Sequence, residues 1–220
     1  MADQLSIGTA PWARSRSIST GALLGQVSFL VAVALGFAAF GGFIGRDLEF
    51  GTARILSFAG IGMLLVANFA GARFRVGTFA MGWLWATATV IGLGIGPFVN
   101  AYFAIDPGAV SAAAGGTALT VGAMGAAGFA MSKDLKSWMK PLSYIMLALF
   151  AVSIVSLVLT GPMSPILSLA IYGVSALLIL VDFNYLRKHG TEDDAVLLAT
   201  GIFVSIINIF VSLLSLFGNR

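Results

Sequence analysis

The sequence predicts an all-α integral membrane protein built as a bundle of seven transmembrane helices. Of its 220 residues, 59% are hydrophobic and only 10% are charged. The mean hydropathy is +0.99, a value that ordinary soluble domains do not reach. Seven apolar stretches are each long enough to cross a hydrocarbon core, which takes about 20 helical residues. The basic residues collect in alternate loops between these stretches.

The seven predicted helices follow one another with short loops between them. They cover residues 22–44, 55–72, 76–104, 109–131, 141–160, 165–185 and 195–217. The third contains Pro97, which lacks a backbone donor and favours a kink or an early helix end near residues 98–104. The loops are too short for a separate soluble domain. We therefore expect a cytoplasmic tail at 1–21, a membrane domain at 22–217 and a C-terminal tail at 218–220.

The basic residues also predict the orientation of the bundle, because lysine and arginine accumulate in short cytoplasmic loops. With the N-terminus inside and the C-terminus outside, nine of the twelve basic residues are cytoplasmic. These nine are Arg14, Arg16, Arg73, Arg75, Lys133, Lys136, Lys140, Arg187 and Lys188. Only Arg46, Arg54 and Arg220 fall outside. A last segment that re-entered the membrane instead of crossing it would leave the side of Arg220 open.

The fourth predicted helix has an unusual composition, because seventeen of its 23 residues are Gly, Ala, Ser or Thr. Small side chains let neighbouring helix backbones approach closely. We therefore place this helix in the centre of the bundle, surrounded by the first, fifth and seventh helices. Its glycines are interpreted as packing residues and not as a nucleotide loop, because no strand precedes them and no lysine follows at the spacing of a phosphate-binding loop.

Asp182 is the main candidate for a functional residue inside the membrane. It ends the uncharged run at residues 167–181. An aspartate in the middle of a membrane helix costs about 2.5 to 3.5 kcal/mol, so such residues usually face the bundle interior and serve a function. Two interpretations remain open. Asp182 either reaches water at the nearby cytoplasmic end, or contacts an internal cavity or a cation such as Arg73, so that its protonation changes helix packing.

Other polar residues inside the predicted helices are expected to form hydrogen bonds between helices, each contributing about 1 kcal/mol. Asn208 lies deep in the last helix, with Ser205 and Ser212 near the same face, and should find a partner across the bundle. The acidic residues Glu192, Asp193 and Asp194 follow Thr191, where they suit the first turn of the last helix. A hydrated divalent ion at these acids is only weakly indicated.

Several classes of function receive no support from the sequence. It has no cysteine and a single histidine, His189, and it contains no zinc motif, serine hydrolase elbow or pair of catalytic aspartates. The basic residues are scattered between apolar segments, which argues against a nucleic-acid partner. We therefore predict no enzyme activity, no catalytic residues, no cofactor and no metal site, and we expect membrane lipid as the surrounding partner.

Three stretches of the sequence resemble the Bax inhibitor family of seven-helix membrane proteins. Residues 116–140 read GTALTVGAMGAAGFAMSKDLKSWMK, and residues 177–220 begin LLILVDFNYLRKHGTEDD and continue through VSIINIFVSLLSLFG. The third, looser match is GIGPFVNAYF at residues 94–103. The resemblance implies a seven-helix fold with the N-terminus inside.

The resemblance also implies a proton-sensitive latch over a calcium leak path. In the family, an acidic residue on the sixth helix pairs with an aspartate on the seventh, and an arginine at the inner end of the second helix can engage the pair. Asp182 matches the first acid, and Arg73 is the nearest match to the arginine. Aligning the IINIF run on the family asparagine at Asn208 places Ser205 where the second aspartate would stand. A serine cannot share a proton with a carboxylate, so the latch is incomplete.

The end of the chain is similar to the bacterial YccA-like branch, and this implies a role in the inner membrane. Proteins of that branch bind and restrain a membrane-anchored AAA zinc protease, which can engage the cytosolic N-terminal tail. The first hypothesis is therefore a modulator of membrane protein quality control, with the protease complex as its partner. The second is a pH-sensitive leak channel for calcium or other cations, with Asp182 near the cytoplasmic gate and calcium or protons as partners. A structural bundle without transport is the third.

Overall fold

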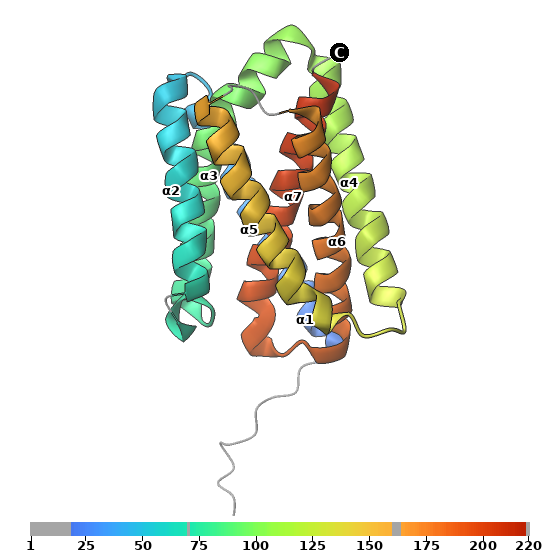
Figure 1. The fold of residues 1–220 in the computed structure, drawn as a ribbon. Helices are drawn as coiled ribbons and strands as arrows, with labels where there is room; N and C mark the ends of the chain where they lie inside the picture. Colours follow the sequence, from blue (N-terminus) through green and yellow to red (C-terminus); the bar gives the residue numbers. More distant parts are fainter. Residues whose placement is uncertain (1–18, 70, 160–163, 219–220) are drawn as a thin grey trace, which may run out of the picture.

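The computed structural model describes residues 19–69, 71–159 and 164–218, and within them it contains seven α-helices long and apolar enough to cross a membrane, and no strand. The helices form one bundle (Figure 1). They are α1 (Thr20–Gly45), α2 (Phe50–Phe69), α3 (Thr78–Ile105), α4 (Pro107–Ala130), α5 (Lys136–Leu159), α6 (Pro165–His189) and α7 (Ala195–Phe217), with short 3-10 helices η2 (Ala72–Phe74) and η3 (Glu192–Asp194). The predicted seven-helix fold is confirmed. Most of the predicted tail, residues 1–18, and Arg220 lie outside the described residues.

Three helices begin at side chains that cap them. The Ser19 hydroxyl accepts a hydrogen bond from the Ala22 N–H at 3.2 Å, and the Ser164 hydroxyl accepts one from the Leu167 N–H at 3.3 Å. At the start of α4, the Asp106 carboxylate accepts from the Ala109 N–H at 3.1 Å. These bonds satisfy backbone donors that have no partner in the first helical turn. A proline follows the cap in α4 and α6, where its missing N–H does no harm.

The acidic cluster before α7 forms part of a helix start, as expected. Asp194 Oδ2 accepts hydrogen bonds from the backbone N–H of Thr191 at 3.0 Å and from its hydroxyl at 2.7 Å. The three acids lie in η3, directly before α7. Their negative charge at the helix N-terminus is favoured by the helix dipole.

Pro97 does not end the third helix. The helix α3 continues past it to Ile105, and Pro97 is buried. Beyond this residue, α3 bends over the end of the bundle toward α4 (Figure 1). A proline removes one backbone hydrogen bond and clashes with the preceding turn, which accounts for a kink at this position.

The structure corrects the predicted place of the fourth helix. In the spanning part of α7, 50% of the residues are buried, against 22% in α4. The helix α7 packs against α6, α4 and α1, and α4 lies at the edge of the bundle (Figure 1). Small residues on α4 do permit a close approach on the sides that face α6 and α7: a Cβ at Gly128 would overlap the Leu180 carbonyl of α6, and one at Gly116 would lie 3.0 Å from a Leu213 methyl group of α7. The larger apolar side chains of α7, such as Phe203 and Ile209, fill the core instead.

Candidate functional site

Asp182 lies inside the bundle, at the interface of α6 with α7. Its side chain is buried, with 7% of the residue exposed. The carboxylate faces Gly201 of α7, because a Cβ added at Gly201 would lie 3.2 Å from Asp182 Oδ2. The glycine therefore leaves the space that the carboxylate occupies. Among the described residues the ion pairs are Arg46 with Asp47 and His189 with Asp134, so Asp182 has no salt bridge within that part of the chain.

The structure does not bring Arg73 to Asp182. Arg73 lies in η2, between α2 and α3, and its guanidinium lies over the Phe79 ring, with Cζ 4.8 Å from the ring centroid. The helix α2 packs against α3 and η2, and α6 is not among the helices with which it makes extensive contact. The expected pairing of the two residues is therefore absent in this conformation.

Of the polar α7 residues named above, two lie in the core and Asn208 is half-buried. The expected hydrogen bond between helices is missing at Ser212, whose buried hydroxyl has no partner within the described residues. Ser205 and Ser212 are buried, with 2% and 1% of each residue exposed. Asn208 reaches across to α5, where its Nδ2 lies 4.0 Å from the Met146 sulfur. This contact is long for a hydrogen bond and involves a weak acceptor. Asn208 thus has a partner across the bundle, but a weak one.

The most densely hydrogen-bonded side chain in the described structure is Asn184, which the sequence analysis did not single out. It is fully buried. Its Nδ2 donates to the carbonyls of Gly128, Met131 and Lys133 at 3.1, 3.3 and 3.0 Å. Its Oδ1 accepts from the Leu135 N–H at 2.9 Å. One side chain of α6 therefore holds both the end of α4 and the loop that leads to α5.

Three further side chains at the end of α6 bind the same loop. Arg187 Nη2 donates to the Met131 carbonyl at 2.9 Å, and Lys188 Nζ donates to the Ser132 carbonyl. His189 Nε2 lies 2.6 Å from Asp134 Oδ2. We call Asn184, Arg187, Lys188 and His189 the loop clamp. The signal in the sequence was the run FNYLRKH, in which hydrogen-bond donors crowd the end of an apolar helix.

The pKa of Asp134, which lies in the loop that the clamp holds, is lowered from its ordinary value. A hydrogen bond from the Lys136 backbone N–H, at 2.9 Å, and the bond with His189 hold the pKa of Asp134 below its ordinary value. Hydrogen bonds to the charged form of a carboxylate favour that form. Because the folded-state pKa is lowered, Asp134 stabilises the loop above its unfolded pKa, and this contribution is lost as pH falls through the folded-state pKa.

Replacing His189 with alanine is expected to raise the pKa of Asp134 toward the ordinary aspartate value of about 3.9. Part of the lowering should remain, because the bond from the Lys136 N–H is unchanged. A carboxyl NMR titration in detergent micelles measures this pKa directly. An unchanged pKa at Asp134 would show that His189 does not interact with it in solution.

Three polar segments meet at the end of the bundle that carries the loop clamp. A Cβ at Gly190, just after α6, would lie 2.6 Å from a methyl group of Leu23, in the first turn of α1. Lys136 Nζ, at the start of α5, lies 5.7 Å from the centre of the Tyr185 ring. The start of α1, the α4–α5 loop and the α6–α7 loop therefore share one end, at the bottom of Figure 1. We call this surface the clamp face.

The clamp face carries exposed charges of both signs. The basic ones are Lys133, Lys136 and Lys140, and the acidic ones include Asp134, Glu192 and Asp193. No group of three His, Asp or Glu side chains lies close enough to hold a metal ion within the described ranges. The face is thus a fixed surface of mixed charge, suited chemically to polar contacts with another molecule.

Comparison with known families gives a match over nearly the whole chain. Residues 21–220 match the model of the family described as inhibitor of apoptosis-promoting Bax1. The match begins one residue after the start of α1 and includes all seven helices. It therefore covers both Asp182 and the loop clamp.

Proposed function

This chain belongs to the Bax inhibitor family of multi-pass membrane proteins, and on that premise we propose that it is a regulatory protein of the bacterial inner membrane that restrains a membrane-anchored AAA zinc protease. The restraint acts through direct contact, with the protease engaging the N-terminal tail beside the clamp face. Its biological consequence is slower degradation of membrane protein substrates.

The observation that carries this proposal is the convergence of polar segments at the clamp face. The tail joins α1 beside the α6–α7 loop, because Leu23 lies against Gly190. The neighbouring α4–α5 loop is held by Asn184 through four hydrogen bonds. A surface that is already ordered loses little conformational entropy when a partner binds. The arrangement therefore supports a docking role for this end of the bundle.

Deleting residues 1–18 is expected to shorten the half-life of the membrane proteins that the protease degrades, because the deletion removes the segment that the protease engages. Ser19 stays in place and continues to cap α1, so the bundle itself should keep its stability. Pulse-chase measurement of a membrane substrate in cells tests this. Arg54→Glu, a charge reversal at the other end of the bundle, is the control and should leave the half-life unchanged. Equal half-lives for the wild type, the deletion and a strain without the protein would contradict the proposal.

A second candidate function is a pH-sensitive leak of calcium or other cations, and the buried position of Asp182 favours it. The carboxylate lies between α6 and α7, against Gly201, so a movement of these two helices past each other would change its surroundings. Ionisable residues inside membrane helices commonly mark ion pathways or proton relays. Asp182 would then control the path by its protonation state.

Purified protein in lipid vesicles is expected, on this second candidate, to pass calcium faster than empty vesicles do. Asp182→Asn should make the calcium flux independent of pH over the range in which the wild type responds, because the amide does not titrate. Asp193→Asn, at an exposed acid of the clamp face, is the matched control and should behave like the wild type. A flux equal to that of empty vesicles would exclude the leak.

A further inference from the structure

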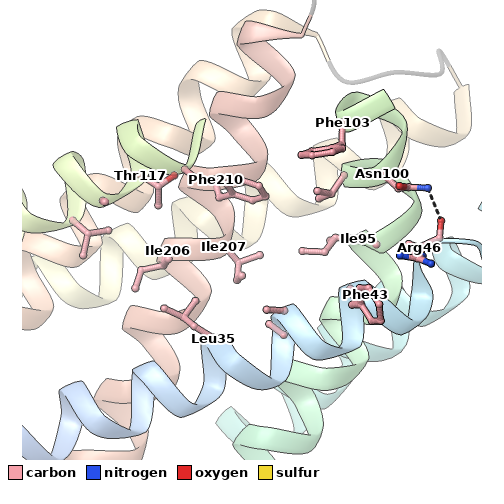
Figure 2. A pocket seen from close by; sticks show the side chains of 18 residues that line it. Leu35, Phe43, Arg46, Ile95, Asn100, Phe103, Thr117, Ile206, Ile207 and Phe210 are labelled. Atoms are coloured by element: carbon pink, nitrogen blue, oxygen red, sulfur yellow. Dashed lines mark hydrogen bonds between the residues drawn. The ribbon is translucent and has the colours of Figure 1, made fainter. Parts of the chain in front are cut away.

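A cavity of about 690 Å³ lies at the end of the bundle opposite the clamp face. Its walls come from α1, α3, α4 and α7 (Figure 2). Figure 2 shows Leu35 of α1 on one side and Thr117 of α4 on the other, with Ile206, Ile207 and Phe210 of α7 between them. We call this cavity the lateral slot. Its volume falls within the range of small-molecule sites, which is about 300 to 1,000 Å³.

The slot opens sideways, between α1 and α4. Small residues form both edges of the opening, with Ala39 and Gly42 on α1 and Ala114 and Ala118 on α4. The three alanines are exposed. Because these positions lie in the middle of membrane-spanning helices, the medium outside the opening is lipid hydrocarbon.

The wall of the slot is almost entirely apolar. Of the residues that line it, only Arg46, Asn100 and Thr117 are polar, and the Thr117 hydroxyl already donates to the Ala113 carbonyl at 2.7 Å. An apolar cavity of this kind does not retain ordered water. An empty one would forfeit dispersion contacts along its whole wall. Hydrocarbon is therefore the filling that the wall favours.

The depth of the slot matches one leaflet of a bilayer. Along α1 it runs from Arg46 down to Leu35, which is about 16 Å of helix rise. Half of a hydrocarbon core is about 15 Å thick. At the deep end, Leu35, Val121 and Ile206 also line a second, smaller cavity of about 200 Å³. These three side chains form the floor of the slot near the middle of the membrane.

Arg46 lines the slot at its end farthest from the floor, directly after the membrane-spanning helix α1, and we expect the phosphates of a lipid leaflet at this level. Its Nε donates to Asp47 Oδ2 at 3.2 Å, and its Cζ lies 4.6 Å from the centre of the Phe43 ring. Asn100 Nδ2 donates to the Arg46 carbonyl at 3.4 Å, which ties this residue to α3 (Figure 2). A guanidinium has five N–H donors, and only the Nε–H has an acceptor among the described residues. Its two terminal nitrogens can therefore bind a phosphate.

We propose that the lateral slot is a phospholipid-binding site, in which one acyl chain enters between α1 and α4 and the lipid phosphate binds Arg46. In the predicted orientation the lipid comes from the outer leaflet. The bound chain completes the packing between α1 and α4, two helices that have no extensive contact of their own.

Fluorescence quenching by brominated lipid tests the acyl-chain part of this proposal. The chain has no cysteine, so a single Val121→Cys places one label on the floor of the slot. In vesicles of phosphatidylethanolamine and phosphatidylglycerol with brominated chains, this label should be quenched. A label at Leu119→Cys, which is 76% exposed on the same helix, should be quenched in any case. A label at Ala113→Cys, where the native residue is fully buried, should not be quenched.

Blocking the opening should separate the slot from the general lipid surface. Ala118→Phe, or Ala39→Phe on the opposite edge, is expected to abolish quenching at position 121 and to leave quenching at position 119 unchanged. Persistent quenching at 121 in both blocked variants would overturn the proposal. So would quenching at 121 no stronger than at 113 in the unblocked protein. Quenching by brominated free fatty acid but not by brominated phospholipid would also overturn the choice of occupant.

The role of Arg46 is tested by titrating the purified protein with phosphatidylglycerol and counting bound lipid by native mass spectrometry. Arg46→Gln is expected to weaken the tightest binding event about tenfold, because a hydrogen bond to a charged group is lost. Arg54→Gln, at the same end of the bundle but outside the slot, is the control and should bind as the wild type does. Equal affinity in the Arg46 and Arg54 variants would contradict the assignment of the phosphate to Arg46.

Discussion

Replacing Asn184 with alanine is expected to lower the free energy of unfolding by about 3 kcal/mol or more. The amide has no exposed surface and makes four hydrogen bonds to the end of α4 and the α4–α5 loop. Each buried backbone group left without a partner costs about 1 to 3 kcal/mol. The variant leaves several such groups without a hydrogen bond. Thermal unfolding in mild detergent measures the loss, and limited proteolysis should show faster cleavage in the loop at residues 131–135.

Asn208→Ala is the matched control for this prediction. It removes the same side chain from a neighbouring helix, but the Asn208 amide makes only the 4.0 Å contact with the Met146 sulfur. The expected loss is about 1 kcal/mol. If the two variants were equally stable, the loop clamp would not hold the α4–α5 loop in the way the structure indicates.

Replacing Gly128 with alanine is the second change with a large expected effect. A Cβ at this position would overlap the backbone carbonyl of Leu180, where α4 crosses α6. Neither backbone can rotate away as a flexible side chain would, so the helices must separate. Overpacking of this kind costs about 1 to 3 kcal/mol, and here it also displaces the Gly128 carbonyl from Asn184 Nδ2. We expect a loss of about 3 kcal/mol in the free energy of unfolding, measured as for Asn184.

Gly122→Ala provides the comparison within the same helix. A Cβ at Gly122 would meet no atom within 4 Å. Because alanine favours a helix over glycine by up to about 1 kcal/mol, this variant should be as stable as the wild type or slightly more stable. Equal changes in stability for the two variants would show that the α4–α6 crossing at Gly128 does not determine the outcome.

The number of helices and most of their ends could be predicted from the sequence, because hydropathy and local caps determine them. Three predicted ends moved by four or five residues: the start of α2, which lies at Phe50 and not at residue 55, the start of α5 and the end of α6. The last two have local causes. The helix α5 starts at Lys136 and not at Pro141, since Asp134 accepts a hydrogen bond from the Lys136 N–H and begins the helix earlier. The helix α6 continues past Tyr185 to His189, where its last residues bind the α4–α5 loop.

The arrangement of helices was harder to predict, because composition says that two backbones can approach but not which ones do. The small residues of α4 predicted a central helix, yet only the side with Gly125 and Gly128 meets α6. In the candidate site, too, the contacts between helices could not be predicted from the sequence. The sequence placed Asp182 near the end of an apolar helix but left open whether its side chain reaches water, because its burial depends on how α7 packs against α6. The partners of Asn184 lie 49 to 56 positions away, so they depend on the folded arrangement of α4 against α6.

Co-purification from native membranes in mild detergent tests the proposed function most directly. The tagged full chain and a variant without residues 1–18 would be extracted at equal levels, and the AAA protease bound to each would be quantified. The proposal predicts that the protease accompanies the full chain and is strongly reduced with the deletion, while both proteins unfold at the same temperature. Absence of the protease from the full chain, or equal amounts with the full chain and the deletion, would contradict it.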